Sequence, residues 1–145
     1  MVEQFSWFFL SFRGRISRQQ FWLGYALTIL VMLLIIPRAQ GMMLMLARPA
    51  SGPWTRRELD VALATGVVVA SLIVTFPMLA LYVKRLHDFD MSGWFLVVFF
   101  LAAAIAEALG LGLRNASLIL VAFIGFVPGK RGDNRFGPDP IVPRS

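Results

Sequence analysis

One uncharged stretch, residues 61–83, constrains the fold more than any other feature of this sequence. Its 23 residues include no Asp, Glu, Lys or Arg. A helix needs about 20 consecutive apolar residues to cross the hydrocarbon core of a bilayer. Of all 145 residues, 58% are hydrophobic and 15% are charged, and a soluble domain of this size could not bury so much apolar surface. The sequence therefore predicts an integral membrane protein.

Three further apolar segments, at residues 20–37, 94–113 and 115–127, predict three more helices. Pro37 should kink or end the first of them. The last segment is short for a full crossing, because the 12 uncharged residues from 116 to 127 cover only ~18 Å of helix. A fourth crossing is the preferred interpretation, and a thin or re-entrant element is the alternative.

The residues that precede the first apolar segment predict a short helix lying on the membrane surface. Four phenylalanines within residues 5–12 follow the spacing of one helical face, and Trp7 would lie at head-group depth. The alternative is that these aromatic rings pack onto the helix bundle. No cleavage site of small residues follows Ile36, so a retained anchor is favoured over a cleaved signal peptide.

Two capping boxes mark the expected helix starts, and helix breakers mark the end of the chain. Ser17 with Gln20 precedes the first apolar segment, and Thr55 with Glu58 precedes the uncharged stretch. Residues 128–145 are rich in proline and glycine and predict a non-helical tail.

The predicted fold class is all-α. We expect residues 1–145 to form a single integral membrane domain. It would consist of a four-helix bundle, a short N-terminal interfacial helix and a non-helical cytoplasmic tail.

Basic residues are distributed unevenly around the apolar segments. With the N-terminus inside, the inner segments hold nine: Arg13, Arg15, Arg18, Lys84, Arg85, Lys130, Arg131, Arg135 and Arg144. The outer segments hold five: Arg38, Arg48, Arg56, Arg57 and Arg114. Positive residues are enriched on the cytoplasmic side of membrane proteins, so we expect both termini in the cytoplasm.

Three short motifs separate the apolar segments. They read Phe12-Arg13-Gly14-Arg15-Ile16-Ser17-Arg18 with Phe21-Trp22, Lys84-Arg85-Leu86-His87-Asp88 with Ser92-Gly93-Trp94, and Asn134-Arg135-Phe136-Gly137-Pro138-Asp139-Pro140. With these motifs in this order, the chain resembles the YhaH-like family of small bacterial inner-membrane proteins, a domain of unknown function (number eight hundred and five). The resemblance implies a multi-spanning protein of the bacterial inner membrane and implies no established activity. Asp90 stands where that family commonly has Gly, and Lys84 stands where it usually has Arg.

All three motifs fall on the cytoplasmic side in this topology, where cations and carboxylates would meet. The candidate lipid- or anion-binding residues are Arg13, Arg15, Arg18, Lys84, Arg85 and Arg135. The candidate structural residues are Ser17, Trp22, His87, Asp88, Ser92, Gly93, Trp94, Asn134, Phe136, Gly137 and Asp139. In one interpretation, carboxylates pair with arginines and lock the helix ends to the tail. In the other, surplus cations bind a phosphate or a phospholipid head group.

The most specific of these expectations concerns the C-terminal tail. Its composition is typical of disorder, whereas the resemblance implies that residues 134–140 are ordered and packed beneath the helix ends near Arg85. Asp139 would then pair with an arginine, and Phe136 would insert among aromatic rings.

The sequence shows no clear catalytic or metal-binding pattern. His87 is the only histidine, and its neighbour Asp88 would not face it on a helix. One histidine with scattered aspartates lacks the spacing of a metal site, and the absence of cysteine excludes thiolate ligands and disulfides. We therefore expect no enzyme activity, no metal and no cofactor.

These observations favour a non-enzymatic membrane protein whose basic cytoplasmic face binds anionic lipid head groups or a protein partner. Membrane lipids are the expected partners and nucleic acid is not, because the basic residues flank apolar segments. Whether the protein forms a homo-oligomer is left open.

The alternative is a small transporter or channel component with the intramembrane carboxylate of Glu107 in its path, although pairing with Arg114 at the outer end explains Glu107 more simply. A lipid-modifying enzyme that uses His87 and Asp88 ranks third.

Overall fold

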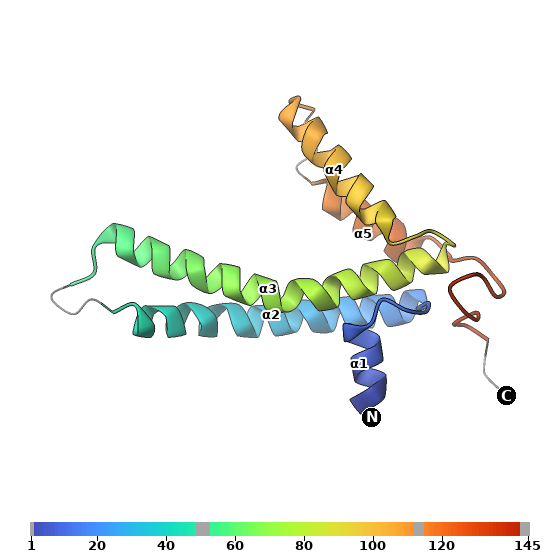
Figure 1. Cartoon of the computed structure of the whole chain (residues 1–145), viewed down its shortest axis with the longest axis horizontal. Coiled ribbons are helices and arrows are strands. Elements are labelled where there is room, and N and C mark those ends of the chain that lie inside the picture. Colours follow the sequence, from blue (N-terminus) through green and yellow to red (C-terminus); the bar gives the residue numbers. More distant parts are fainter. Residues whose placement is uncertain (1, 49–52, 112–114, 143–145) are drawn as a thin grey trace. The chain divides into compact units, whose positions relative to one another are not determined.

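The computed structural model describes residues 2–48, 53–111 and 115–142. Within these ranges the secondary structure is helical, without any β-strand. The helices are α1 (Val2–Leu10), α2 (Arg18–Leu46), α3 (Arg56–Asp88), α4 (Trp94–Ala108) and α5 (Ala116–Phe126) (Figure 1). The prediction of an all-α protein is confirmed.

Both predicted capping boxes form at the starts of the two long helices. The amide of Ser17 donates to Gln20 Oε1 at 2.9 Å, and the amide of Gln20 donates to Ser17 Oγ at 3.3 Å. Thr55 and Glu58 form the same reciprocal pair, at 2.9 and 3.3 Å. These bonds satisfy amides that a helix start leaves without partners, so local sequence alone can place the two starts.

The ends of the first three helices differ from the predictions. α1 ends at Leu10, so Phe12 lies outside the predicted aromatic face. α2 continues through Pro37 to Leu46, because a proline removes one backbone hydrogen bond without forcing an apolar helix to stop. α3 extends beyond residue 83 to Asp88, so the charged residues that follow the uncharged stretch are also helical.

A C-terminal turn built on Gly110 ends α4 well before the predicted boundary at 113. Gly110 has a φ of +76°, its amide donates to the carbonyl of Glu107, and the amide of Leu111 donates to the carbonyl of Ala106, both at 2.9 Å. This pairing is a Schellman motif, which closes a helix at a left-handed glycine. The segment that follows includes Arg114, the predicted partner of Glu107, and Arg114 lies outside the described residues.

Among the helices of the described residues, α2 and α3 are long and apolar enough to span a membrane. α4 has 15 residues and α5 has 11, which correspond to ~22 Å and ~16 Å of helix, less than the ~30 Å hydrocarbon core. A bundle with four full crossings therefore stays a prediction.

The chain divides into two compact units, which we call the hairpin unit and the site unit. The hairpin unit is Ala26–Met78, and the site unit combines Met1–Tyr25 with Leu79–Ser145. In the hairpin unit the backbones of α2 and α3 approach closely, since a Cβ at Gly66 would lie 2.6 Å from the Cα of Gln40. Small residues at such contacts are typical of helix packing in membranes.

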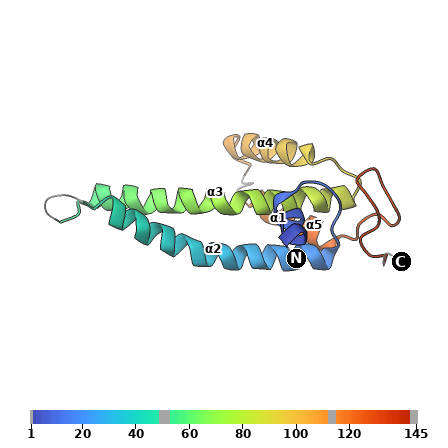
Figure 2. The ribbon, with the colours of Figure 1, turned by 60° about the horizontal axis from the view of Figure 1, so that its bottom comes forward.

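In the site unit, α1, α5 and the tail pack around the start of α2 and the end of α3 (Figure 1). Figure 2 shows α5 beside the start of α2. The Trp22 indole N–H donates to the carbonyl of Gly125 at 3.0 Å, and the rings of Trp22 and Phe126 lie 5.1 Å apart. A Cβ at Gly125 would lie 2.5 Å from the Trp22 ring, so the glycine makes room for the indole.

The aromatic residues of α1 differ in burial, and the position of this helix on the membrane surface stays a prediction. Phe9 is buried against the site unit, whereas Phe5 and Leu10 are more than half exposed. α1 therefore packs one edge onto the unit and leaves other apolar side chains at its surface.

Candidate functional site

The last turn of α3 places an unusual set of polar residues in the interior of the site unit. Lys84 and Arg85 are fully buried, and His87 and Asp88 are also buried. Charged groups cost several kcal/mol to remove from water unless they are paired and hydrogen-bonded. The partners of these residues therefore define the candidate site.

Asp88 is clamped between two arginines that come from different parts of the chain. Arg15, in the loop before α2, donates from Nε and Nη2 to Oδ1 of Asp88 at 3.1 and 2.9 Å. Arg85, one turn earlier on α3, donates from Nη1 to Oδ2 of Asp88. The side chains of both arginines are fully buried, and that of Asp88 is 4% exposed. We call these three residues the Asp88 clamp.

The remaining donors of Arg15 hold the C-terminal tail. Arg15 Nη2 donates to the carbonyl of Lys130 at 2.6 Å, and Nη1 donates to the carbonyl of Gly132 at 2.6 Å and to that of Gly137 at 3.3 Å. A guanidinium has five N–H donors in a fixed plane, which suits it to join one carboxylate to several carbonyls.

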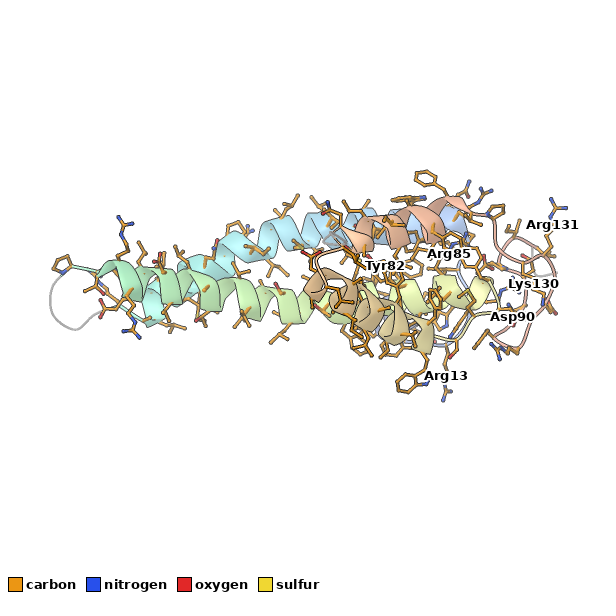
Figure 3. The ribbon with its side chains drawn as sticks, turned by 90° about the horizontal axis from the view of Figure 1, so that it is seen from above. Arg13, Tyr82, Arg85, Asp90, Lys130 and Arg131 are labelled. Atoms are coloured by element: carbon orange, nitrogen blue, oxygen red, sulfur yellow. The ribbon has the colours of Figure 1, made fainter. Side chains whose placement is uncertain are left out.

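Arg85 performs the same role for the end of α5. Its Nε donates to the carbonyl of Ile124 at 2.7 Å, and its Nη2 donates to that of Val127 at 2.6 Å. The carbonyls at the C-terminal end of a helix have no partners within the helix. Arg85 supplies that partner, and Figure 3 shows it directed into the site unit.

Gly129 is needed because the tail passes directly against the clamp. The amide of Lys130 donates to the main-chain carbonyl of Asp88 at 2.8 Å. A Cβ at Gly129 would lie 1.8 Å from Asp88 Oδ2, a distance that no side chain can occupy. Sequence reasoning missed this residue, although its position in a Pro-Gly turn could have indicated a close backbone approach.

His87 and Asn134 form a second contact between α3 and the tail. The His87 ring stacks on Phe136 at 3.8 Å with an interplanar angle of 4°, and its Nδ1 lies 3.1 Å from the carbonyl of Gly14. Asn134 Nδ2 donates to the carbonyl of His87 at 2.8 Å. The backbones of Asn134 and Gly137 pair with each other at 3.1 Å, and Gly137 has a left-handed φ of +141°. The tail motif thus forms a hydrogen-bonded turn that packs against the end of α3.

Lys84 binds α1. Its ammonium donates to the carbonyls of Trp7 and Phe8, the latter at 2.9 Å, and it lies 4.2 Å from the centre of the Trp7 ring. A cation over an aromatic face is favourable in a desolvated site. Lys84 therefore attaches the N-terminal helix to α3.

Two further aspartates organise the tail from its exposed side. The prediction that Asp139 pairs with an arginine is wrong among the described residues: the amides of Ile141 and Gly132 donate to it and hold its pKa below the usual value. Asp90 has a φ of +64°, in the left-handed region that glycine adopts most easily. This conformation explains why the family that the chain resembles commonly has glycine at this position. A hydrogen bond from Lys130 keeps the pKa of Asp90 low.

The candidate lipid-binding residues separate into two groups. Arg15 and Arg85 are buried and paired with Asp88, as in the ion-pair interpretation, and Lys84 is buried and donates to backbone carbonyls of α1. Arg13, Arg18 and Arg135 are exposed. Arg135 pairs with Asp90 at 3.3 Å, and Arg18 donates to the carbonyl of Phe126 at 3.3 Å.

The predicted structural residues at the start of α4 have smaller roles. The N-cap of α4 is Gly93, which has no side chain to accept an amide, and the amide of Trp94 donates a long hydrogen bond to Ser92 Oγ at 3.5 Å. A Cβ at Gly93 would lie 3.0 Å from Val83, so the glycine allows this turn to approach α3. Trp94 is 75% exposed.

Together these features define a class of protein: a small helical membrane protein in which buried ion pairs tie a polar tail to the helix ends. The family described as "Protein of unknown function (DUF805)" matches residues 9–138, and the chain belongs to this family. The resemblance found in the sequence is therefore confirmed.

Two curated relatives give the same result. The chain is 26% identical over 140 residues to inner membrane protein YhaH of Escherichia coli strain K12, covering 91% of this chain and 88% of that protein. Inner membrane protein YhaH of Escherichia coli O157:H7 matches with the same figures. No solved structure matches the chain significantly. These relatives support a location in the bacterial inner membrane.

Replacing Arg15 by alanine should release the tail. Removing one partner from a buried ion pair typically costs about 3–5 kcal/mol, because the other charge stays buried. We expect amide exchange at Asn134 and Gly137 to accelerate by on the order of 100-fold or more in detergent micelles. Arg13→Ala is the matched control, since Arg13 is exposed in the same loop. Equal protection in the two variants would contradict the role assigned to Arg15.

Proposed function

We propose that this protein is a non-enzymatic, multi-spanning membrane protein whose cytoplasmic face binds anionic lipid head groups. The observation that carries the proposal is the division of its basic residues. The Asp88 clamp and Lys84 use buried cations for internal contacts, while other cations at the same end of the site unit stay on the surface.

The exposed cations include Arg13 and Arg131, which point away from the site unit in Figure 3. Arg18 is exposed at the first turn of α2, where an apolar helix begins. Each basic residue near an anionic membrane surface contributes about 1 kcal/mol of attraction. Lys130 and Arg135 contribute less to this face, because both are paired with Asp90.

The contacts within the site unit support a topology in which both termini share one side of the membrane. Arg15 precedes α2, Asp88 ends α3, and the tail carbonyls bind Arg15, so three polar segments meet at one place. α4 and α5 then leave this side and return to it, either by crossing twice or by forming a re-entrant pair. The excess of nine over five basic residues assigns that side to the cytoplasm.

Reporter fusions at Met1 and Ser145 test this topology. We expect cytoplasmic signals from both ends. A periplasmic signal from the C-terminal fusion would contradict the proposed return of α5.

The environment of His87 and Asp88 supports a non-enzymatic role. A general base needs a free ring nitrogen beside a reacting group and a residue that orients it. In the site unit the His87 ring is covered by Phe136, and Asp88 is bound by two arginines instead of by His87. The alternative of a transporter with Glu107 in its path gains no support from the grooves of the site unit: Glu107 does not line either of the two grooves described below.

Lipid retention should depend on the exposed cations of the site unit. We expect the variant Arg13→Ala/Arg18→Ala/Arg131→Ala to retain less phosphatidylglycerol than the wild type when extracted in mild detergent and analysed by native mass spectrometry. The matched control, Arg38→Ala/Arg56→Ala/Arg57→Ala, removes the same charge from exposed positions of the hairpin unit. We expect a smaller loss from that control.

Two outcomes would contradict the proposal, provided that both variants keep the helical content of the wild type. Equal losses from both variants would mean that retention follows net charge alone. Full retention by the site-unit variant would exclude lipid binding by these cations and favour a protein partner.

A further inference from the structure

A groove lies on the surface of the site unit where the start of α2 meets the end of α5. Its volume is about 620 Å³, and it is lined by Arg18, Gln19, Trp22, Leu23, Gly125 and Phe126. The lining is sorted by polarity along α2: Arg18 and Gln19 belong to the first turn, and the apolar residues follow. A cationic end that leads into apolar walls matches the chemistry of a phospholipid.

The apolar wall of this groove is held in place by contacts within the protein. Trp22 is fixed by its hydrogen bond to the carbonyl of Gly125 and by its ring contact with Phe126. Leu23 is 71% exposed and Phe126 is 67% exposed, so both offer apolar surface to a neighbouring molecule. Binding sites that are largely pre-formed lose less free energy to ordering when a ligand binds.

The polar end of the groove offers a guanidinium to an anion. Among the described residues, Arg18 donates one hydrogen bond, to the carbonyl of Phe126 at 3.3 Å. Because a guanidinium has five N–H donors, most of its capacity stays available for a phosphate, which it can bind through two parallel bonds. The exposed side chain of Gln19 also lines the groove and can donate as well.

A second and larger groove, of about 950 Å³, lies between α1 and the tail and suits an anion less well. Its lining includes Asp139, a carboxylate whose pKa is lowered by the amides of Ile141 and Gly132 and which is therefore negative at neutral pH. Its only cation among the lining residues, Arg15, already binds Asp88 and the tail carbonyls. Charge complementarity thus favours the groove at Arg18.

We propose that the groove between α2 and α5 binds one anionic phospholipid, with the phosphate on Arg18 and an acyl chain along Trp22, Leu23 and Phe126. This inference rests on the proposed function and narrows it from a basic face to a single site. The bound lipid would cover the apolar walls that the site unit leaves exposed beside α5.

The experiment titrates phosphatidylglycerol, and separately phosphatidylethanolamine, into the full-length protein in detergent and measures stepwise affinities by native mass spectrometry. Two variants alter the two ends of the groove: Arg18→Ala removes the cation, and Leu23→Trp fills the apolar part. The matched controls are Arg48→Ala, an exposed cation of the hairpin unit, and Leu118→Trp, at a position on α5 that is 62% exposed and outside the groove.

We expect the first phosphatidylglycerol to bind at least about fivefold more weakly to both groove variants than to the wild type, with both controls unchanged. We also expect the wild type to bind phosphatidylethanolamine more weakly than phosphatidylglycerol. Wild-type helical content in each variant, measured by circular dichroism, separates loss of the site from loss of the fold.

The outcomes that overturn the inference are distinct from those that overturn the proposed function. Wild-type affinity in both groove variants, while Arg13→Ala/Arg18→Ala/Arg131→Ala loses lipid, would exclude the groove and keep the basic face. A loss in Leu23→Trp alone would show an apolar site without selection for anions and would overturn the assignment of the phosphate. Equal affinity of the wild type for both lipids would overturn the inference and the proposed function together.

Discussion

The buried carboxylate of Asp88 is the constraint on which the site unit depends. A carboxylate with 4% of its side chain exposed is costly unless every lone pair finds a donor. Arg15 and Arg85 provide those donors, but they bring two further buried charges whose own N–H groups need acceptors. The carbonyls of the tail and of the end of α5 supply them. The ordering of a proline- and glycine-rich tail thus follows from the burial of one acidic side chain.

The sequence predicted those features that depend on local chemistry. The uncharged stretch and the capping boxes at Ser17 and Thr55 depend only on residues that are close in sequence, and the corresponding helix starts agree with the structure. The sequence did not predict the end of α4 correctly. A glycine such as Gly110 can either weaken a helix from within or close it with a C-terminal turn, and only the hydrogen bonds in the structure show which of these occurs. The acceptors of Arg15 were also missed, since backbone carbonyls leave no signature in side-chain composition.

The basic residues of the site unit form a buried group and an exposed group, and these groups have different roles. A count of basic residues treats Arg15 and Arg13 alike, whereas the first is buried in the Asp88 clamp and the second is exposed. The buried cations shape the end of the helices, and the exposed ones are those that could meet a lipid head group. From the sequence, both groups were assigned to a single candidate site. The sequence could not separate them, because the burial of each residue depends on partners from distant parts of the chain.

A double-mutant cycle between Arg15 and Asp88 tests the central role of the clamp most directly. The free energy of opening of the tail would be measured by amide exchange in the wild type, Arg15→Gln, Asp88→Asn and the double variant. If Asp88 holds the tail through Arg15, the double variant should lose less than the sum of the single losses, with a coupling energy of about 1–3 kcal/mol. Additive losses, within about 0.5 kcal/mol, would show that the two residues act independently and would contradict the central role of the clamp.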